Sequence, residues 1–429
     1  MKRRQVKKEM KRERILLCKP KMSGRELDFI KPALAEDWAV PMGPDVNEFE
    51  HELERLTGCA DKRVVALSSG TAALHLALIA CGVGPGDEVM VQSMTFCAST
   101  NPVAYLGAIP VFVDSERDTW NMDPDLLEEA IKDRMAKTGR KPKAIIPVAL
   151  YGMPYQIERI MEIADRYGIP VIEDAAEGFC SRYDGRLLGT FGRFGALSFN
   201  GNKMITTSGG GALICPDEAT AQKIKWYATQ ARESYPYYQH EAVGYNYRLS
   251  NISACIGRAQ LTVLDEHLEH HKRMQRLYCE LLNDVEGFTM HSAPTLLPPQ
   301  GGYDSNYWLC TAIIDQEARV KGEDEAYSSV ISGAVGGAAG VTHTASSATT
   351  DCQPNNNVEA MRVWLDKANI EARPLWKPMH RQPVFRDSTA IINGVSEQLF
   401  HTGICLPAGP YVTDDDVRYI VDCIKAGFC

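Results

Sequence analysis

Short apolar segments alternate with amphipathic segments over residues 60–215, and this alternation constrains the fold more than any other feature. VVALSS (64–69) is typical of a strand, and it leads into GTAALHLALIACG (70–82), whose apolar spacing predicts a helix. Further strands are predicted at DEVMVQS, IPVFVD, KAIIPVAL and IPVIED, with a helix at PYQIERIMEIADRYG between the last two. Strands that alternate with helices predict an α/β domain with a largely parallel sheet.

The chain has 429 residues, which is too long for one ordinary core, so we expect more than one domain. We expect a basic extension at 1–14, a large domain at 15–275 that includes a linking helix, and a smaller C-terminal α+β domain at 276–429. Residues 317–357 are rich in Gly, Ala, Ser, Thr and Asn, and they predict a long mobile loop inside the smaller domain.

Charge and cysteine content exclude several classes of protein. The net charge of −9 argues against a nucleic-acid binder, and no apolar run has the length of a membrane helix. No signal peptide is visible, and the thirteen cysteines show no CxxC pair or zinc-like spacing, so we expect a cytoplasmic protein with reduced thiols and no metal site. The leader MKRRQVKKEMKRER is expected to be solvated; contact with nucleic acid or an anionic membrane is the alternative.

Polar residues follow two of the predicted strands. Ser69, Gly70 and Thr71 lie where a strand turns into a helix, and free N–H groups at a helix start favour an anion such as phosphate. The alternative is a simple N-cap. Asp174 ends the strand IPVIED, where its carboxylate either pairs with a cationic ligand group or caps the next helix. Ligands of such sheets bind at the carboxyl ends of strands.

Two further residues have chemistry that suits the same edge of the sheet. Phe96 follows the strand DEVMVQSMT; taken alone it is more consistent with ordinary core, and the alternative is a face on which a flat ring stacks. Lys203 lies in SFNGNKMITTSGGG, between the strand patterns FGALSF and GGGALIC, with Ser198 five residues before it. A partly desolvated lysine can form a Schiff base with an aldehyde, whereas a surface lysine is the alternative.

These four sites together meet the requirements of pyridoxal phosphate. A phosphate cradle, a stacking ring, a carboxylate for the pyridinium nitrogen and an amine for the aldehyde are all present. A carboxylate that keeps the ring nitrogen protonated lets the ring accept electrons from the α-carbon of a substrate. The combination therefore predicts a pyridoxal phosphate enzyme.

SSGTAALHLAL, MTFCASTNPV, VIEDAAEGF, SFNGNK and GYNYRLSNISA occur in this order, and with them the chain resembles sugar-nucleotide aminotransferases of the DegT type. The resemblance covers residues 15–316 and 358–429 and implies fold type I, the aspartate-aminotransferase fold; the insertion and the leader lie outside the family pattern. WYATQARE, SFNGNKMITTSGGG and ARPLWKPMH resemble the UDP-N-acetylbacillosamine transaminase branch. This branch moves an amino group from L-glutamate to C4 of a UDP-linked 4-keto-6-deoxy-N-acetylglucosamine.

The resemblance assigns roles residue by residue. Lys203 matches the lysine that forms the Schiff base, Asp174 the partner of the pyridine nitrogen, and Phe96 the stacking ring. The remaining matched residues have expected roles in binding: the phosphate is expected at Ser69, Gly70, Thr71 and Ser198, the phenolic oxygen at Glu177, a neighbouring subunit's site at Asn246 and Arg248, and the sugar nucleotide at Arg373, Trp376, Lys377 and His380. GPDV (43–46) matches the family's N-terminal motif, near which a residue touches the substrate.

The resemblance also implies a homodimer with shared sites, and it leaves the acceptor sugar open. A GDP-linked 4-keto-6-deoxymannose and the L-altro isomer of the UDP sugar are the alternatives. Arg232 and Arg248 are candidates for the glutamate carboxylates, which arginine binds in a bidentate manner. Dehydratases of the family carry His where this chain has Lys203, and the intact Lys203, Asp174 and phosphate motif argue against a DNA-binding regulator with the same fold.

Overall fold

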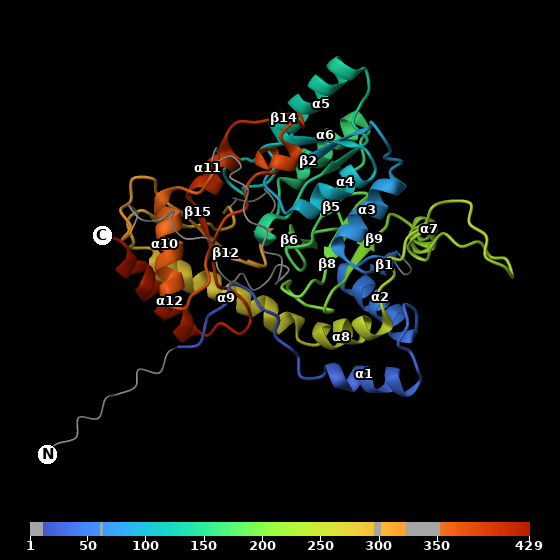
Figure 1. The fold of residues 1–429 in the computed structure, drawn as a ribbon, viewed down its shortest axis with the longest axis horizontal. Coiled ribbons are helices and arrows are strands. Elements are labelled where there is room, and N and C mark those ends of the chain that lie inside the picture. Colours follow the sequence, from blue (N-terminus) through green and yellow to red (C-terminus); the bar gives the residue numbers. More distant parts are fainter. Residues whose placement is uncertain (1–11, 61–62, 296–301, 323–351) are drawn as a thin grey trace.

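Helices and strands alternate along most of the chain (Figure 1), and the computed structural model describes residues 12–60, 63–295, 302–322 and 352–429. The α-helices of this part are α1 (Glu26–Ala35), α2 (Pro44–Thr57), α3 (Gly70–Ala80), α4 (Asn101–Tyr105), α5 (Pro124–Thr138), α6 (Ile157–Tyr167), α7 (Glu218–Ala228), α8 (Asn251–Leu261), α9 (Leu264–Leu282), α10 (Asn356–Lys367), α11 (Val395–Thr402) and α12 (Asp414–Gly427). Its strands are β1 (Val64–Leu67), β2 (Glu88–Gln92), β3 (Ile109–Val113), β4 (Ala144–Ile146), β5 (Ile172–Asp174), β6 (Arg182–Tyr183), β7 (Arg186–Leu187), β8 (Phe194–Ser198), β9 (Gly211–Ile214), β10 (Phe288–Met290), β11 (Tyr303–Asp304), β12 (Cys310–Ile314), β13 (Arg373–Pro374), β14 (Ala390–Ile391) and β15 (Gly403–Leu406).

Two four-stranded sheets, ordered β1-β9-β8-β5 and β14-β3-β2-β4, form the centre of the fold. Parallel bridges from Ile145 to Val171 and from Val148 to Asp174 connect the β4 edge of one sheet to the β5 edge of the other. The pairs β2/β3, β2/β4, β3/β14 and β5/β8 are parallel, whereas β9 runs antiparallel to β1 and β8. The expected α/β fold with a mixed, mostly parallel sheet is therefore confirmed.

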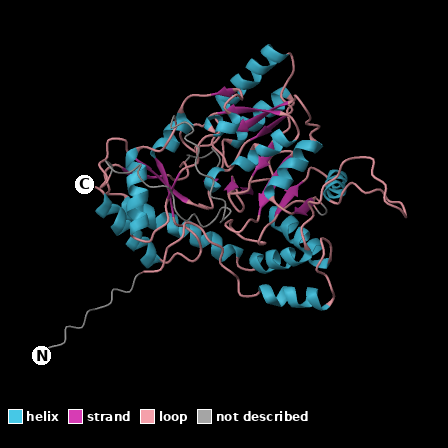
Figure 2. Ribbon diagram, viewed as in Figure 1, coloured by secondary structure: helices cyan, strands magenta, loops and turns pink. Residues whose placement is uncertain are grey.

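Both faces of this sheet are covered by helices (Figure 2), because the side chains of each strand alternate between two apolar clusters. In β1, Val64 and Ala66 join the cluster that includes α2, α5 and α6, whereas Val65 and Leu67 join the cluster that includes α3 and α7. Strands that are buried on both faces read as continuous apolar runs, as the segment VVAL does. Each predicted strand of this region is present in the structure.

Another four-stranded sheet, separate from the two central ones, is built mainly from the C-terminal part of the chain. Its order is β10-β12-β15-β13, and all its strand pairs are antiparallel. Its apolar side chains form one cluster with residues of α9, α10 and α12. The helix predicted at DEHLEHHKRMQRLYCELL is α9, which runs without interruption past residue 275. The proposed division of the chain at that residue thus falls inside a helix and stays a prediction.

Parts of two predicted segments lie outside the described residues. These are residues 1–11 of the basic leader and residues 323–351 of the Gly/Ala/Ser-rich insertion. At the end of the leader, Arg12 forms an ion pair with Asp416 and Arg14 with Asp366. In the part of the chain that is described, no helix is long and apolar enough to cross a membrane, and no cluster of His, Cys, Asp or Glu could hold a metal ion.

Candidate active site

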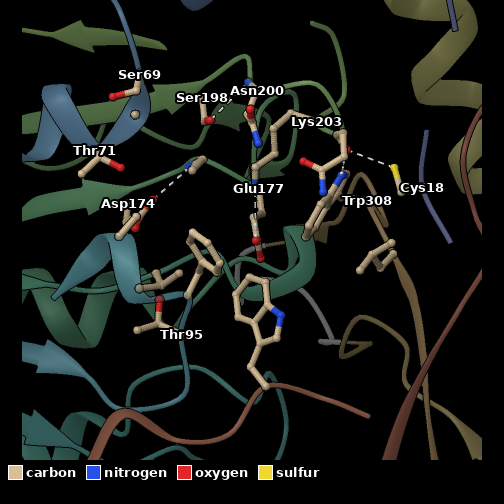
Figure 3. Close-up of a pocket in the computed structure, with 18 of the residues that line it drawn as sticks. Cys18, Ser69, Thr71, Thr95, Asp174, Glu177, Ser198, Asn200, Lys203 and Trp308 are labelled. Carbon is tan, nitrogen blue, oxygen red and sulfur yellow. Dashed lines mark hydrogen bonds and ion pairs between the residues drawn. The ribbon is translucent and has the colours of Figure 1, made fainter. Parts of the chain in front are cut away.

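A cavity of about 470 Å³ opens at the carboxyl ends of β1, β5 and β8 (Figure 3), which is where ligands bind in sheets of this kind. Ten of the fourteen residues predicted for the site line it: Ser69, Gly70, Thr71, Phe96, Asp174, Glu177, Ser198, Lys203, Arg373 and Trp376. The structure therefore brings together residues that are more than 300 positions apart in the sequence.

Lys203 lies in the turn between β8 and β9, and its backbone N–H donates to the carbonyl of Asn200 at 3.0 Å. Its Nζ donates to Oε1 of Glu177 at 3.1 Å and lies 4.1 Å from the ring centroid of Trp308. Only 12% of the side chain is exposed, because both flanking strands are buried. The alternative of a solvated surface lysine is therefore wrong.

Asp174, at the end of β5, is buried and accepts two hydrogen bonds. Its Oδ2 accepts from Oγ of Ser99 at 2.6 Å, and its Oδ1 accepts from the N–H of Ala176 at 3.1 Å. Burial raises the pKa of Asp174, and the bond from Ser99 lowers it. In the described part of the chain, no lysine or arginine forms an ion pair with this carboxylate, and no helix follows β5 directly for it to cap. A buried carboxylate of this kind at a cavity wall is suited to a cationic ligand group.

Glu177 lies between the lysine and the backbone of a neighbouring loop. Its Oε1 accepts from Lys203, and its Oε2 accepts from the N–H of Tyr151 at 2.8 Å. Burial raises the pKa of Glu177, and the charge of Lys203 opposes that rise. Because both oxygens have donors, the orientation of this carboxylate toward the cavity is fixed.

The N-terminus of α3 forms another wall of the cavity. Oγ of Ser69 accepts from the N–H of Ala72 at 3.0 Å, so the N-cap interpretation is confirmed for this side chain. No acidic residue lies in the first turn of α3, so the helix dipole favours an anion there. A Cβ atom added to Gly70 would lie 3.0 Å from Cβ of Ser198, and one added to Gly211 would lie 2.5 Å from the backbone N of Gly70. Glycine at these two positions thus lets three backbone segments meet around this end of the cavity.

Phe96 follows β2 and is 54% exposed, so the interpretation of this residue as ordinary core is wrong. Its ring lies 5.5 Å from that of Trp376, which in turn lies 5.1 Å from the ring of Tyr151. An exposed aromatic ring in a cavity wall is available to stack on a flat ligand.

Four predicted site residues do not line this cavity. Arg248 is buried, and its Nη1 donates to Glu50 and to the carbonyl of Ala66. The others are bound elsewhere: Oδ1 of Asn246 accepts from Gln230 at 3.4 Å, the carbonyl of Lys377 accepts from Gln382 at 3.3 Å, and His380 contacts Ser93 at 2.6 Å and Glu397 at 3.1 Å. A role of Asn246 or Arg248 in a neighbouring subunit concerns a second chain and stays a prediction.

Arg232 and the motif GPDV (43–46), for which the sequence suggested substrate contacts, also do not line the cavity. The guanidinium of Arg232 lies 4.3 Å from the ring centroid of Tyr238. In GPDV, Asp45 pairs with Arg258 at 2.6 Å, and Oδ1 of Asn251 accepts from the backbone N–H of Asp45 at 3.0 Å. The GPDV motif therefore has a structural role at the start of α2.

The sequence did not reveal several lining residues. Cys18 lies beside the lysine turn, where its Sγ donates to the carbonyl of Asn202 at 3.0 Å, and burial raises its pKa to about 12. Trp308 packs under Lys203, and Glu371 accepts a hydrogen bond from the N–H of Leu17 at 3.1 Å. Thr95 could have been found, since it is the last residue of the predicted strand DEVMVQSMT. Cys18, Trp308 and Glu371 carry no such signal.

Comparison with known proteins identifies relatives along nearly the whole chain. The model of the DegT/DnrJ/EryC1/StrS aminotransferase family matches residues 20–339 and 338–425. EpsN of Bacillus subtilis (strain 168), which its name classes with the pyridoxal phosphate-dependent aminotransferases, is 42% identical over 96% of this chain and 95% of its own length. The GDP-perosamine synthase of Escherichia coli O157:H7 is 31% identical over 96% of this chain and 98% of its own length. A crystal structure of a DegT DnrJ EryC1 StrS aminotransferase from Brucella abortus superposes with a TM-score of 0.78 at 29% identity, covering 94% of this chain and 95% of that one.

Proposed function

Because the chain belongs to the DegT/DnrJ/EryC1/StrS aminotransferase family, we propose that it aminates C4 of a UDP-linked 4-keto-6-deoxy-N-acetylglucosamine with L-glutamate as the donor. The products are UDP-4-amino-4,6-dideoxy-N-acetylglucosamine and 2-oxoglutarate. At the coarser level, the protein is a pyridoxal phosphate-dependent nucleotide-sugar aminotransferase of glycan biosynthesis. The family establishes this coarser activity, whereas the donor, the nucleotide and the sugar are our proposal.

One observation carries the assignment of the cofactor site: a single cavity is lined by the lysine amine, a buried carboxylate, a helix N-terminus and an exposed aromatic ring. The residues present fit pyridoxal phosphate. Asp174 would hold the protonated ring nitrogen: among the described residues it forms no ion pair with a lysine or arginine, and the charge of Lys203 lowers its pKa from a greater distance. The first turn of α3 with Thr71 and Ser198 would hold the phosphate, and Phe96 would cover the ring.

Pyridoxal phosphate, when bound, supplies an electron sink that makes the α-proton of an amino acid acidic. Lys203 would hold the cofactor aldehyde through Nζ, and its amine, once released by the amino donor, would move a proton to or from the reacting carbon. Glu177 holds Nζ within reach of the cavity during that interval, because its Oε1 lies 3.1 Å from the amine. The same lysine serves both half-reactions, first with the amino acid and then with the keto sugar.

The proposed sugar-nucleotide site uses further residues of the cavity wall. Arg373 and Trp376 line it, and the guanidinium of Arg373 is anchored by Nε and Nη2 to Oε1 of Glu371 at 3.0 and 2.6 Å. The side chain of Arg373 is 42% exposed, so it can also reach an anionic substrate such as a diphosphate or a carboxylate. Lys377 and His380 lie outside the lining, and a role for them in binding the sugar nucleotide stays part of the proposal.

A GDP-linked 4-keto-6-deoxymannose is the second candidate acceptor, and similarity to GDP-perosamine synthase is the observation that favours it. The two acceptors differ in both base and sugar. We rank the UDP sugar first because the motifs WYATQARE, SFNGNKMITTSGGG and ARPLWKPMH resemble the corresponding branch of the family.

The test is a product analysis with both acceptors. Purified protein with pyridoxal phosphate and ¹⁵N-labelled L-glutamate is incubated in parallel with the UDP sugar and the GDP sugar, and products are identified by mass spectrometry and by NMR of the aminated carbon. The proposal predicts ¹⁵N at C4 of the UDP sugar, with kcat/KM at least about 100-fold above that for the GDP sugar, a ratio typical of a site that recognises polar groups of its substrate. Preference for the GDP sugar would replace the proposed acceptor with the second candidate.

A further inference from the structure

The amine of Lys203 lies against an aromatic ring whose position no sequence motif predicts. Its Nζ lies 4.1 Å from the ring centroid of Trp308 and 3.1 Å from Oε1 of Glu177 (Figure 3). The face of an indole attracts an ammonium group and has little attraction for a neutral amine. Ring and carboxylate thus both lie against the side-chain nitrogen of the lysine.

The position of the Trp308 ring is fixed by its own hydrogen bonds. The side chain is 3% exposed, and its Nε1–H donates to the carbonyl of Asn202 at 2.6 Å. Asn202 directly precedes Lys203, so the indole contacts both the lysine amine and the backbone turn that carries it. Oδ1 of Asn202 is buried and has no hydrogen-bond partner among the described residues, so this residue is held through its carbonyl, which accepts from the indole of Trp308 and from Sγ of Cys18.

One buried amide connects Trp308 to the other partner of the lysine. Oδ1 of Asn306 accepts from the backbone N–H of Trp308 at 2.8 Å, and Nδ2 of Asn306 donates to the carbonyls of Glu177 at 2.7 Å and Phe179 at 2.8 Å. Asn306 is fully buried and uses its acceptor and both donors, which assigns the orientation of the amide. A Cβ atom added to Gly152 would lie 1.9 Å from Oδ1 of Asn306, so glycine there leaves room for this amide.

We propose that Trp308, held by Asn306, is a positioning residue that keeps the side-chain nitrogen of Lys203 beside Glu177 whenever the lysine is not bonded to the cofactor. This inference rests on the proposed function, in which the amine is released during each half-reaction. Nζ accepts the α-proton of the amino donor, the α-carbon keeps the electron pair of the broken C–H bond, and the resulting ammonium is stabilised by the ring and the carboxylate. The same ammonium then delivers its proton from a defined position.

The test uses Trp308→Leu, which removes the ring face and the N–H, and Trp308→Phe, which keeps a smaller face. Trp364→Leu is the matched control. Trp364 also donates its Nε1–H to a backbone carbonyl, that of Cys423 at 2.9 Å, and Nζ of Lys321 lies 5.6 Å from its ring centroid. It packs against the C-terminal apolar cluster, away from the cavity.

The first readout needs no cofactor. It is the rate at which acetic anhydride acetylates Lys203 in each apoprotein, followed by mass spectrometry. Only the neutral amine reacts, so we expect the rate to rise roughly 10- to 30-fold in Trp308→Leu and about threefold in Trp308→Phe, as expected for loss or weakening of a desolvated cation–π contact.

The second readout is the glutamate half-reaction of the holoenzyme in single turnover with protonated and α-deuterated L-glutamate. We expect Trp308→Leu to slow this half-reaction and to raise its deuterium isotope effect, because proton transfer by a poorly placed amine becomes more rate-limiting, while Trp364→Leu matches wild type in both readouts. Acetylation rates and isotope effects equal to wild type in Trp308→Leu would overturn the inference. If that variant does not fold, unchanged values in Trp308→Phe would overturn it. A wild-type enzyme without any glutamate half-reaction would refute the proposed donor instead, and the acetylation rates would then decide the inference alone.

Discussion

Ser99 donates a hydrogen bond of 2.6 Å from its Oγ to Oδ2 of Asp174, and the same Oγ lies 2.6 Å from Oγ1 of Thr95. Both hydroxyl residues belong to the segment after β2, whereas the carboxylate ends β5. The two loops are thus connected at the base of the cavity by a buried carboxylate with neutral donors. Neutral donors orient Asp174 without cancelling its charge, which leaves that charge for a cationic ligand group.

Replacing this carboxylate by an amide is expected to stabilise the apoprotein while it removes activity. Burial makes the pKa of Asp174 higher in the folded than in the unfolded chain, so stability falls as pH rises from about 3.9, the ordinary aspartate value, through the raised folded value. At pH 7 we expect Asp174→Asn to raise the free energy of unfolding of the apoprotein by roughly 1–3 kcal/mol, and we expect the gain to vanish below about pH 3.9. Urea titrations at pH 7 and pH 3.5 measure this. A less stable variant at pH 7 would mean that the apoprotein itself neutralises this charge.

Phe96 is exposed in the cavity wall, so shortening it should affect ligand binding rather than folding. We expect Phe96→Leu to raise the Kd for pyridoxal phosphate by roughly 2- to 10-fold, the range that corresponds to loss of an aromatic stacking contact, with an unchanged free energy of unfolding of the apoprotein. Tyr105→Leu is the control, because Tyr105 is 59% exposed and does not line the cavity. Equilibrium dialysis gives the Kd values. Equal Kd values for Phe96→Leu and wild type would argue against stacking.

Replacement of Arg248 is expected to lower the free energy of unfolding of the chain itself, whatever its effect on a neighbouring subunit. Its guanidinium pairs with Glu50, a buried carboxylate that also accepts from the N–H of Ala66 at 2.8 Å and from Lys225 at 3.2 Å. Arg248→Ala removes one of the cations that pair with the buried carboxylate of Glu50. Because a buried charge that loses a partner is costly, we expect the free energy of unfolding to fall by roughly 3–5 kcal/mol. Light scattering on the same samples tests the predicted homodimer. A variant as stable as wild type that loses only cofactor affinity would instead support the predicted role of Arg248 in a neighbouring site.

Lys203→Ala is expected to abolish turnover and to leave cofactor binding measurable, because the contacts proposed for the phosphate and the ring do not involve the lysine. Loss of proton transfer alone lowers the rate by roughly 10²- to 10⁴-fold, and loss of the covalent bond adds to this. Lys203→Arg is the charge control, since it retains a cation for Glu177 without an amine that can bond the aldehyde. Initial rates and dialysis binding measure the two effects. Turnover close to wild type in either variant would contradict the role of the lysine.

The sequence was sufficient to predict that several of the expected site residues lie at one cavity, because carboxyl ends of neighbouring strands lie at one edge of a sheet. Asp174, Ser198 and Lys203 follow recognisable strands, so their proximity could be expected without coordinates. Trp308 reaches the lysine from 105 positions further along the chain, through a loop before β12, and no periodicity encodes such a contact. Phe96 shows the opposite problem: an aromatic residue after a buried strand resembles core until its exposure is known.

Arg248 could not be assigned from its motif for a related reason. The segment GYNYRLS matches a family pattern, but the burial of the guanidinium against Glu50 depends on α2, which lies about 200 residues earlier. The partner of a buried charge is set by tertiary packing, and sequence spacing does not report it. The same holds for Asp45, whose partners Asn251 and Arg258 come from α8.

A visible spectrum during stepwise addition of the two substrates tests the role of Lys203 and the acceptor in one experiment. The purified holoenzyme is recorded alone, after L-glutamate, and again after the UDP-linked 4-keto-6-deoxy-N-acetylglucosamine, with Lys203→Ala as the control. We expect glutamate to remove the absorbance band of the lysine-bound cofactor, the keto sugar to restore it, and Lys203→Ala to show no such band at the start. Loss of the band without its return would contradict the proposed acceptor, and a well-folded wild-type protein without the band would contradict the assignment of Lys203 itself.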